Sequence, residues 1–314
     1  MNPIVAKARL YSWGAIQALR LGRPEISLGF LGGIGDDLLC TAPIEEWLQR
    51  GAKRIWFFTR HPGLYPHFDA RVRLVGEDPR LVQLAARLGR PLRPLGYSHY
   101  DAATDRDSPL TEHLVAAVCR NAGLSGRVRL RPHLRLRADE RAAMSRWADF
   151  IAVQSSSLSA SVPMQNKQWR ADHLQAVLAQ FSGRLSFVQI GSPADPPLAS
   201  AEDLRGRTSL RETAALLARA RLFLGIPGFL MHLARAVECP AVIVYGGREP
   251  PELTGYPCNE NLARHPPCAP CWQRSRCDFD HVCTGAILPA DVANAVESSL
   301  DRPRGPLAEV TADL

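Results

Sequence analysis

Short apolar runs alternate with stretches of helical spacing along most of the chain, and this alternation constrains the fold more than any other feature. Such a pattern is typical of a parallel sheet with helices packed on its faces. In the second half we expect strands at residues 151–154, 185–190, 222–225 and 241–245, and helices at residues 169–180, 209–220, 230–237 and 289–300. The sequence therefore predicts an α/β fold.

The first half shows the same alternation less regularly. We expect strands at residues 26–30, 54–58 and 72–75, a glycine-rich turn at 31–35, and helices at 37–50 and 112–122. An arginine-rich stretch at 127–141, with Pro132 inside it, marks the best inter-domain boundary. We therefore expect two Rossmann-like domains that face a central cleft, because such sheets bind ligands beyond the carboxyl ends of their strands.

These boundaries divide the 314 residues into an N-terminal domain at 1–145 and a C-terminal domain at 146–301. A chain of this length usually forms about two domains. The second domain carries a Cys-rich loop at residues 250–284, and the tail at 302–314 is expected to fray.

The first 23 residues are not a signal peptide, because Lys7, Arg9 and Arg20 interrupt their apolar positions. No apolar run approaches the roughly 18 residues of a transmembrane helix. We expect a cytoplasmic protein. A helix with Trp13 and Leu21 on one face either packs on the domain body or anchors the protein peripherally on anionic lipid of the inner membrane.

The net charge of +7 suits an anionic partner, such as a sugar nucleotide or a phosphorylated glycolipid. The basic residues are scattered along the chain and no nucleic-acid motif with interleaved aromatic residues occurs. We therefore expect no nucleic-acid partner.

Four segments carry the functional signal. They read GIGDDLLCTAP at 33–43, KQW at 167–169, LRGRTSLRE at 204–212 and GIPGFLMHLARA at 225–236. Taken together, they resemble glycosyltransferase family 9, the ADP-heptose:lipopolysaccharide heptosyltransferase family. The resemblance covers most of residues 26–300 and implies a GT-B type fold.

The resemblance also implies roles for individual residues. Asp36 takes the place of the family's general base, which accepts the proton of the attacking sugar hydroxyl. Lys167 and the helix N-terminus near Gly228 would bind the donor diphosphate, since free N–H groups and the helix dipole favour anions. The full set of candidates is Asp36 for catalysis, Lys167, Ser155, Ser157, Gly228, Met231 and His232 for the donor, and Arg60 and His61 for the acceptor.

Each assignment has a purely structural alternative. Asp36 or Asp37 would simply cap the following helix. Lys167 would be an exposed surface lysine, and His232 a buried histidine with a satisfied hydrogen bond. The sequence alone leaves these alternatives open.

The fourth segment departs from the family pattern. The family reads Gly-x-Asp-Ser-Gly where this chain has Pro227, Gly228 and Phe229, so a carboxylate and a hydroxyl are missing. The leading hypothesis is an inverting transferase that needs no catalytic metal and moves heptose or a similar sugar from a nucleotide-diphosphate donor to a glycan, glycolipid or protein. The alternative is an inactive family member that binds sugar nucleotides or acts as a scaffold.

Five of the eight cysteines crowd together, at Cys258, Cys268, Cys271, Cys277 and Cys283. In a reducing compartment such a cluster predicts a structural zinc or iron site before disulfides. Spacing favours Cys268, Cys271, Cys277 and Cys283 as ligands. A resemblance to the iron-binding autotransporter heptosyltransferases instead implies Cys258, Cys268, Cys271 and Cys283.

Overall fold

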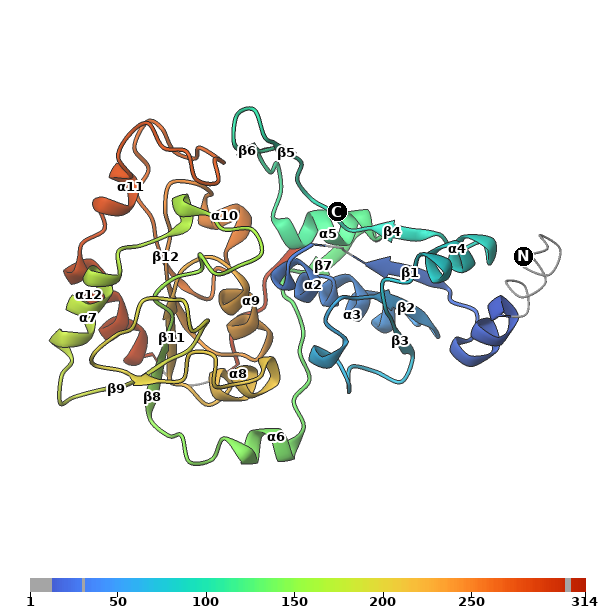
Figure 1. Ribbon diagram of the computed structural model, residues 1–314, viewed down its shortest axis with the longest axis horizontal. Coiled ribbons are helices and arrows are strands. Elements are labelled where there is room, and N and C mark those ends of the chain that lie inside the picture. Colours follow the sequence, from blue (N-terminus) through green and yellow to red (C-terminus); the bar gives the residue numbers. More distant parts are fainter. Residues whose placement is uncertain (1–12, 30–31, 303–305) are drawn as a thin grey trace, which may run out of the picture.

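The computed structural model describes residues 13–29, 32–302 and 306–314. It has two lobes, which Figure 1 shows with the N-terminal lobe on the right and the C-terminal lobe on the left. The first lobe holds a four-stranded sheet in the order β3-β2-β1-β4, and the second a six-stranded sheet in the order β10-β9-β8-β11-β12-β13. Neighbouring strands in both sheets are parallel. The expected α/β architecture is confirmed.

The sheet of the N-terminal lobe begins close to where the sequence places it. Its elements are β1 (Ile26–Gly29), α2 (Ile34–Leu39), α3 (Thr41–Gln49), β2 (Ile55–Phe58), η1 (Pro62–Leu64), β3 (Val72–Val75), α4 (Pro79–Arg87), β4 (Leu92–Pro94) and α5 (Leu114–Asn121). The end of the first expected strand and the start of the glycine-rich turn, residues 30–31, lie outside the described residues. The single helix expected at 37–50 is two helices, because Pro43 has no N–H to bond to the carbonyl of Leu39.

The C-terminal lobe follows the predicted alternation closely. Its elements are β8 (Phe150–Val153), η2 (Gln165–Lys167), α7 (Ala171–Gln180), β9 (Ser186–Gln189), β10 (Glu202–Asp203), α8 (Leu210–Leu217), β11 (Leu222–Gly225), α9 (Phe229–Ala236), β12 (Ala241–Val244), α10 (Pro251–Thr254), β13 (Glu260–Leu262), α11 (Val282–Gly285) and α12 (Pro289–Leu300). Helix α8 begins with a capping box, since Ser209 Oγ accepts from Glu212 N at 3.2 Å and Glu212 Oε2 accepts from Ser209 N at 2.8 Å.

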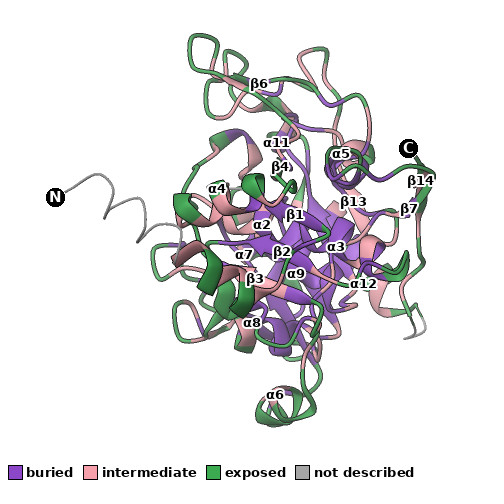
Figure 2. Ribbon diagram, turned by 90° about the vertical axis from the view of Figure 1, so that its right-hand side faces the viewer, coloured by how far each residue is buried: buried purple, intermediate pink, exposed green. Residues whose placement is uncertain are grey.

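The central strands are buried on both faces. In β8, Ile151 and Val153 belong to one apolar cluster, whereas Phe150 and Ala152 belong to another. The first cluster lies under α7 and α12, and the second lies under α8 and α9 and continues into the N-terminal lobe. Figure 2 shows this shared core as buried ribbon in the middle of the molecule, with α6 (Ala138–Ala143) exposed at its edge. A core shared by both lobes limits how far they can separate.

The lobes meet where α2 packs against α9. A Cβ atom on Gly35 would lie 3.5 Å from the Cα atom of Phe229, so a small residue is needed at this crossing. A second junction involves α6, which lies between the lobes in sequence. Arg211 of α8 pairs with Glu140 of α6 and donates to the carbonyl of Leu64 at 2.7 Å.

The expectation of a frayed tail is wrong. Residues of β14 (Thr311–Asp313) pair antiparallel with β7 (Arg127–Arg129), which lies in the stretch expected to be a linker. Arg131 pairs with Glu309 at 2.6 Å, and Arg235 donates to the carbonyl of Ala308 at 3.2 Å. The end of the chain therefore returns from the C-terminal lobe to the N-terminal lobe. There it supplies hydrogen-bond and ion-pair partners to residues of both lobes.

The N-terminal segment is described from residue 13 onward, and residues 13–21 are helical. The guanidinium of Arg80 in α4 lies 4.6 Å from the ring centre of Trp13, and Leu21 packs on the apolar cluster around Trp56. This part of the segment therefore packs on the N-terminal lobe. Within the described ranges, no helix combines the length and the apolar character needed to cross a membrane.

Candidate active site

A cleft between the lobes holds about 1190 Å³ of space that opens to solvent. Its walls come from α2 and residues 97–110 of the N-terminal lobe and from segments that follow β8, β11 and β12. Ligands of parallel α/β sheets bind beyond the carboxyl ends of such strands. The residues that line this cleft include Asp36, Tyr97, Asp107, Lys167, Gly228, His232, Arg248, Glu249 and Arg274.

Asp36 lies in the first turn of α2 and lines the cleft. Its Oδ2 atom accepts a hydrogen bond from Gly33 N at 3.0 Å, and its Oδ1 atom accepts from the Tyr97 hydroxyl at 2.6 Å. Burial raises the pKa of Asp36 above its ordinary value of 3.8, against these two hydrogen bonds. The carboxyl thus caps the helix and still faces the cleft, and a raised pKa makes it a stronger base.

Asp37 is buried in the N-terminal lobe and does not line the cleft. Its Oδ2 atom accepts a hydrogen bond from the Thr59 hydroxyl, whereas Oδ1 has no partner among the described residues. Burial raises the pKa of Asp37 from 3.8 to about 7. Of the two adjacent carboxyls, only Asp36 is placed to meet a ligand.

Lys167 ends η2 and is not the exposed lysine of the structural alternative. Its ammonium lies 2.9 Å from Glu249 Oε1, and its side chain is 18% exposed. Burial would raise the pKa of Glu249, but the cations of Lys167 and Arg248 hold it below the ordinary value of 4.5. The cleft therefore contains a lysine fixed by a buried carboxylate.

Two serines expected at the donor site bond to other parts of the C-terminal lobe. The Ser155 hydroxyl donates to the carbonyl of Pro196 at 2.6 Å and accepts from Gln189 Nε2 at 2.9 Å. The Ser157 hydroxyl accepts from Gln168 Nε2 at 2.9 Å. Neither serine lines the cleft.

Helix α9 points its N-terminus at the cleft. Gly228, Phe229 and His232 line the wall, and no side chain caps the start of this helix. Its first N–H groups are therefore available to an anion. Met231 lies on the opposite side, buried in the core, where its sulfur accepts a hydrogen bond from the Tyr245 hydroxyl at 3.3 Å. The structure does not bring Met231 to the cleft.

His232 is a satisfied buried histidine and a cleft residue at once. Its Nδ1 atom shares a hydrogen bond of 2.7 Å with the Tyr256 hydroxyl. Burial and the nearby Lys167 lower the pKa of His232 to about 3, so the ring is neutral near pH 7. The ring of His113, from the start of α5, lies 6.1 Å from the same tyrosine ring. Tyr256 thus joins histidines of both lobes.

The two expected acceptor residues lie outside the cleft lining. Arg60 is exposed and pairs with Glu77. The backbone N–H of His61 donates to the Thr59 hydroxyl at 2.9 Å, which supports the loop after β2. The structure therefore does not place Arg60 or His61 where an acceptor in the cleft would lie.

The sequence reasoning missed several cleft residues. Arg248 and Glu249 lie shortly after β12, which ends at Val244, and their place near the carboxyl end of a predicted strand could have marked them. Asp107 ends the two-residue strand β6 (Arg106–Asp107) and Arg274 lies in the Cys-rich loop; neither segment carries a motif, so no local signal points to them. They are brought together because Arg274 donates to both carboxylate oxygens of Asp107, at 3.0 and 2.7 Å.

The cysteines of the Cys-rich loop are all free thiols. Burial is the main cause that raises the pKa of the Cys271 thiol, and the nearby Cys283 and Cys277 act in the same direction. Cys258 lies instead beside Arg235 and Glu238. Within the described part of the chain, no three His, Cys, Asp or Glu side chains are arranged to hold a metal ion. The thiols are neighbours, but they are not assembled into a site.

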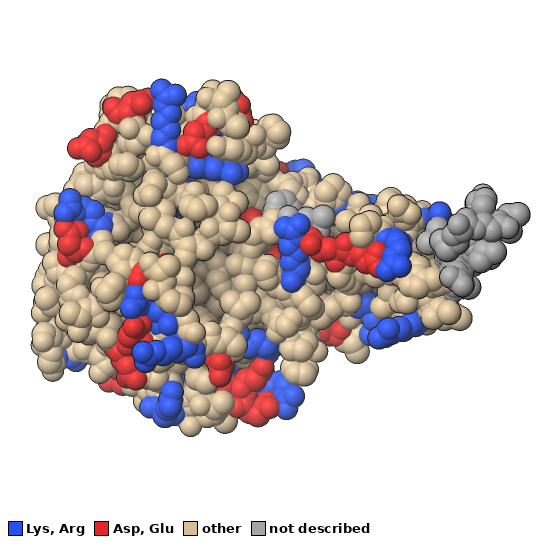
Figure 3. All heavy atoms as spheres, viewed as in Figure 1, with Lys and Arg blue, Asp and Glu red and all other residues tan. Residues whose placement is uncertain are grey.

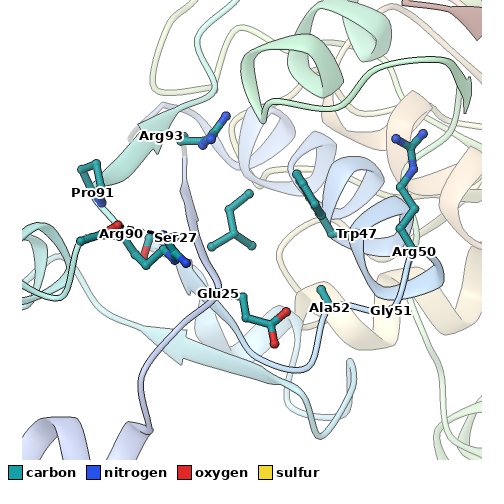
Figure 4. A pocket seen from close by; sticks show the side chains of 11 residues that line it. Glu25, Ser27, Trp47, Arg50, Gly51, Ala52, Arg90, Pro91 and Arg93 are labelled. Carbon is teal, nitrogen blue, oxygen red and sulfur yellow. Dashed lines mark hydrogen bonds between the residues drawn. The ribbon is translucent and has the colours of Figure 1, made fainter.

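A further cavity lies in the N-terminal lobe at the amino ends of β1 and β4. Figure 4 shows Glu25, Trp47, Arg50 and Arg90 around it. The guanidinium of Arg50 is committed to the carbonyls of Ser125 and Arg127, at 2.8 and 3.0 Å. This cavity is at the wrong end of the strands for an α/β active site, so the inter-lobe cleft is the better candidate.

On the face of the molecule shown in Figure 3, basic and acidic side chains are interspersed, and the basic ones do not form a single patch. The concentrated charge lies in the cleft instead.

Several solved structures with a similar architecture are glycosyltransferases. The iron-containing dodecameric glycosyltransferase TibC from enterotoxigenic E. coli is 19% identical, with a TM-score of 0.65 over 88% of this chain and 76% of that chain. ADP-heptose LPS heptosyltransferase II of E. coli is 14% identical, with a TM-score of 0.62 over 88% and 98%. A family 9 glycosyltransferase of Veillonella parvula is 16% identical, with a TM-score of 0.61 over 89% and 98%. At these identities the likeness establishes the GT-B type fold.

Family membership rests on the sequence itself. No curated protein sequence matches the chain. The family model of glycosyltransferase family 9 (heptosyltransferase), however, matches residues 120–282, which is just over half of the 314 residues. The chain therefore belongs to glycosyltransferase family 9 and is a GT-B type glycosyltransferase that takes its sugar from a nucleotide-sugar donor.

Proposed function

We propose that the inter-lobe cleft catalyses an inverting sugar transfer in which Asp36 is the general base. The observation that supports this most directly is that the Asp36 carboxyl and the Lys167 ammonium line the same cleft, close enough for the lysine to lower the pKa of the carboxyl. Tyr97 holds the carboxyl in place through its 2.6 Å hydrogen bond. A base and an anion-binding cation are what the two ends of a glycosyl transfer require.

In the proposed step, an acceptor hydroxyl attacks the anomeric carbon from the face opposite the diphosphate. The new C–O bond forms as the bond to the phosphate oxygen breaks, and the diphosphate leaves with the electron pair. The hydroxyl proton passes to Asp36. Lys167 and the N–H groups at the start of α9 stabilise the charge of the leaving diphosphate.

We propose heptose or a similar sugar as the donor sugar. ADP-D-β-D-heptose is the ligand in a structure of TibC, and ADP-heptose and LPS are named in the description of the E. coli relative. The acceptor is a glycan, a glycolipid or a protein.

The base assignment is tested with Asp36→Asn. We expect transfer to fall by at least ~100-fold, the lower end of what general base catalysis contributes, while donor affinity stays within about threefold. Asp139→Asn, which alters an exposed carboxyl of α6, is the matched control and should retain full activity. Full transfer by Asp36→Asn would exclude this residue as the base.

A panel of ADP-, GDP-, UDP- and dTDP-sugars, read by thermal shift and by transfer, identifies the donor. Stabilisation together with turnover by one nucleotide class supports the enzyme. Silence across the panel would favour the inactive scaffold that the departure at Pro227–Phe229 suggests.

We also propose a structural zinc or iron site in the Cys-rich loop, with Cys268, Cys271, Cys277 and Cys283 as the ligands. TibC is iron-containing. Cys271 and Cys283 both lie beside Gly247, since Cys271 N donates to the Gly247 carbonyl at 2.9 Å and a Cβ atom on Gly247 would lie 2.9 Å from Cys283 Sγ. Cys258 lies instead beside Arg235 and Glu238, which favours the set without Cys258. Thiolates are ligands that zinc and iron both accept, and a bound ion would cross-link a loop that has little regular structure.

Elemental analysis by mass spectrometry distinguishes the two ligand sets. We expect about one metal ion per chain in the wild type and in Cys258→Ser, and a strong loss in Cys277→Ser. The reverse pattern would support the set with Cys258, and trace metal in the purified wild type would end the proposal.

For the chain's organisation, we propose domains at 1–145 and 146–301, with α6 in the connection and residues 302–314 returning to β7. We further propose a cytoplasmic enzyme whose N-terminal segment contacts the membrane peripherally, because Ile16 and Leu19 are 60% and 85% exposed. Flotation with anionic vesicles tests this contact. Equal flotation of the wild type and Leu19→Gln would argue against it.

A further inference from the structure

Five charged side chains form one continuous chain across the cleft. Lys167 Nζ lies 2.9 Å from Glu249 Oε1, and the other oxygen of Glu249 accepts from Arg248. Arg248 also donates to Asp107, which in turn accepts from Arg274 at 2.7 and 3.0 Å. Asp107 comes from the N-terminal lobe and the other four come from the C-terminal lobe. Positive and negative side chains therefore alternate along this row, and the row connects the two lobes.

Each of the three cations has N–H donors that the ion pairs described above do not use. Arg248 is 5% exposed, yet its Nε atom has no hydrogen-bond partner among the described residues. Arg274 uses Nε and Nη2 for Asp107, and a guanidinium offers five N–H donors in all. Lys167 has one carboxylate partner and three N–H donors. Because a buried donor without a partner is costly, such an arrangement indicates that an acceptor-rich ligand completes it.

We propose that Arg248 and Arg274, together with Lys167, bind the diphosphate of the nucleotide-sugar donor, and that Asp107 of the opposite lobe is the residue that positions both arginines. This inference rests on the function proposed above and deepens it. Arginine suits the role because its planar fork of N–H groups meets two phosphate oxygens at once.

The charges of the network fit a polyanion. Three cations face two carboxylates among its five side chains, and the dipole of α9 adds positive potential beside them, while the Asp36 carboxyl lies in the same cleft. The site also lies beside the proposed base, since the charge of Asp107 acts on Asp36 and that of Arg248 acts on Tyr97. The arginines are therefore close to the point where the bond between sugar and phosphate would break.

Strands β5 (Tyr100–Asp101) and β6 (Arg106–Asp107) form a hairpin that is hydrogen-bonded to residues 272–276 of the Cys-rich loop. This contact, called the clasp below, holds Asp107 in place. Asp107 N donates to the carbonyl of Trp272, and Arg274 N donates to the carbonyl of Asp105, both at 2.9 Å. The guanidinium of Arg274 lies 3.7 Å from the ring centre of Tyr100. Figure 1 shows the hairpin leaning from the N-terminal lobe toward the C-terminal lobe.

The clasp gives the Cys-rich loop a role in catalysis. It carries Arg274 into the cleft, and the opposite lobe then fixes the direction of the guanidinium. Donor affinity therefore depends on a residue of the lobe that does not carry the donor helix α9.

The test measures binding of ADP, GDP, UDP and inorganic pyrophosphate by isothermal titration calorimetry. For Arg274→Gln and Arg248→Gln we expect at least ~10-fold weaker affinity for whichever nucleoside diphosphate binds the wild type, and for pyrophosphate, which corresponds to ~1.4 kcal/mol. Affinity for the matching nucleoside monophosphate should change less. Arg276→Gln is the control, because this arginine belongs to the same loop but pairs with Asp278 at an exposed position.

Asp107→Asn separates positioning from a merely structural role. We expect its KM for the donor to rise at least ~10-fold, with a smaller change in kcat, and Asp107→Glu to recover part of the loss. The partly exposed Arg274 keeps the test valid if a variant at the buried Arg248 fails to fold.

Wild-type affinity for nucleoside diphosphates in a folded Arg274→Gln variant would overturn the inference and leave the proposed function intact. An equal loss in Arg276→Gln would also overturn it. A wild-type protein that binds none of the probes would instead refute the proposed function itself, and the inference with it.

Discussion

The buried carboxyl of Asp37 makes the stability of this protein depend on pH in an unusual direction. Its folded pKa of about 7 lies above the ordinary value of 3.8, so the folded state binds a proton more tightly than the unfolded state does. The stability that this proton contributes is fully present below pH ~4 and is lost as the pH rises through about 7. Most buried or paired carboxyls with lowered pKa values act in the opposite sense.

The size of the effect follows from the difference between the two pKa values. From 3.8 to about 7 it corresponds to ~4 kcal/mol, at roughly 1.4 kcal/mol per pKa unit. About 2.5 kcal/mol of this falls between pH 5 and pH 8, where both states can be studied. The side chain is 1% exposed, so solvent screening does not reduce the figure appreciably.

The perturbation is Asp37→Asn, read by urea unfolding at pH 5 and pH 8. The amide oxygen of the new side chain can still accept the hydrogen bond from Thr59, but it cannot lose a proton. Relative to the wild type, we expect the variant's free energy of unfolding to rise by ~2.5 kcal/mol between the two pH values. Asp139→Asn, at an exposed position, should show no such change. An Asp37→Asn difference that is the same at both pH values would refute the reasoning.

Three further predictions concern the contacts between the lobes, and urea unfolding measures each. Arg211→Ala should cost ~2–4 kcal/mol, because it leaves Glu140 without its partner at the α6–α8 junction, whereas Arg221→Ala at an exposed pair should cost under ~1 kcal/mol. Gly35→Ala should be tolerated, but Gly35→Leu should lose ~1–3 kcal/mol, since the α2–α9 crossing has no room beyond a methyl group. Deleting residues 306–314 should cost ~1–3 kcal/mol through the loss of β14 and of the carbonyl partner of Arg235, and unchanged stability would mean that the tail is not part of the fold.

The sequence predicts best where one face of each element is buried against a neighbour close in the chain. The central strands β8, β11 and β12 are apolar on both faces, and α8 carries its own capping residues, so local patterns suffice there. Pro43 indicates that the helix expected at residues 37–50 is interrupted near Cys40. The helical spacing of apolar residues on both sides of Cys40 instead predicts one continuous helix. In the structure the effect of the proline dominates, and the segment forms two helices.

Contacts between distant segments leave no such trace. The pairing of β14 with β7 joins residues about 180 positions apart, and the pairing of Asp107 with Arg274 spans 167 positions. Each of these segments alone is too short to carry a recognisable pattern, since β6, β7 and β14 have only two or three residues each. For the site, the family resemblance names Asp36, Lys167 and the start of α9, and the structure brings these three to one cleft. It does not reveal that Ser155, Ser157 and Met231 serve the scaffold, because a motif does not say which way a side chain points.

The departure at Pro227–Phe229 has a different meaning once the cleft is described. The missing carboxylate of that loop has no replacement in α9, but Glu249 and Asp107 place carboxylates in the same cleft, each bound to cations. The start of α9 still presents uncapped N–H groups, so the elements that suit a diphosphate are retained. Relative to the family pattern, this loop has lost the polar side chains of an aspartate and a serine. Such side chains can distinguish one sugar from another by hydrogen bonding. We therefore infer that the loop alters the choice of sugar more than the ability to hold the nucleotide. Donors that share a nucleotide but differ in the sugar should then differ more in kcat/KM than in the affinity for the released nucleoside diphosphate.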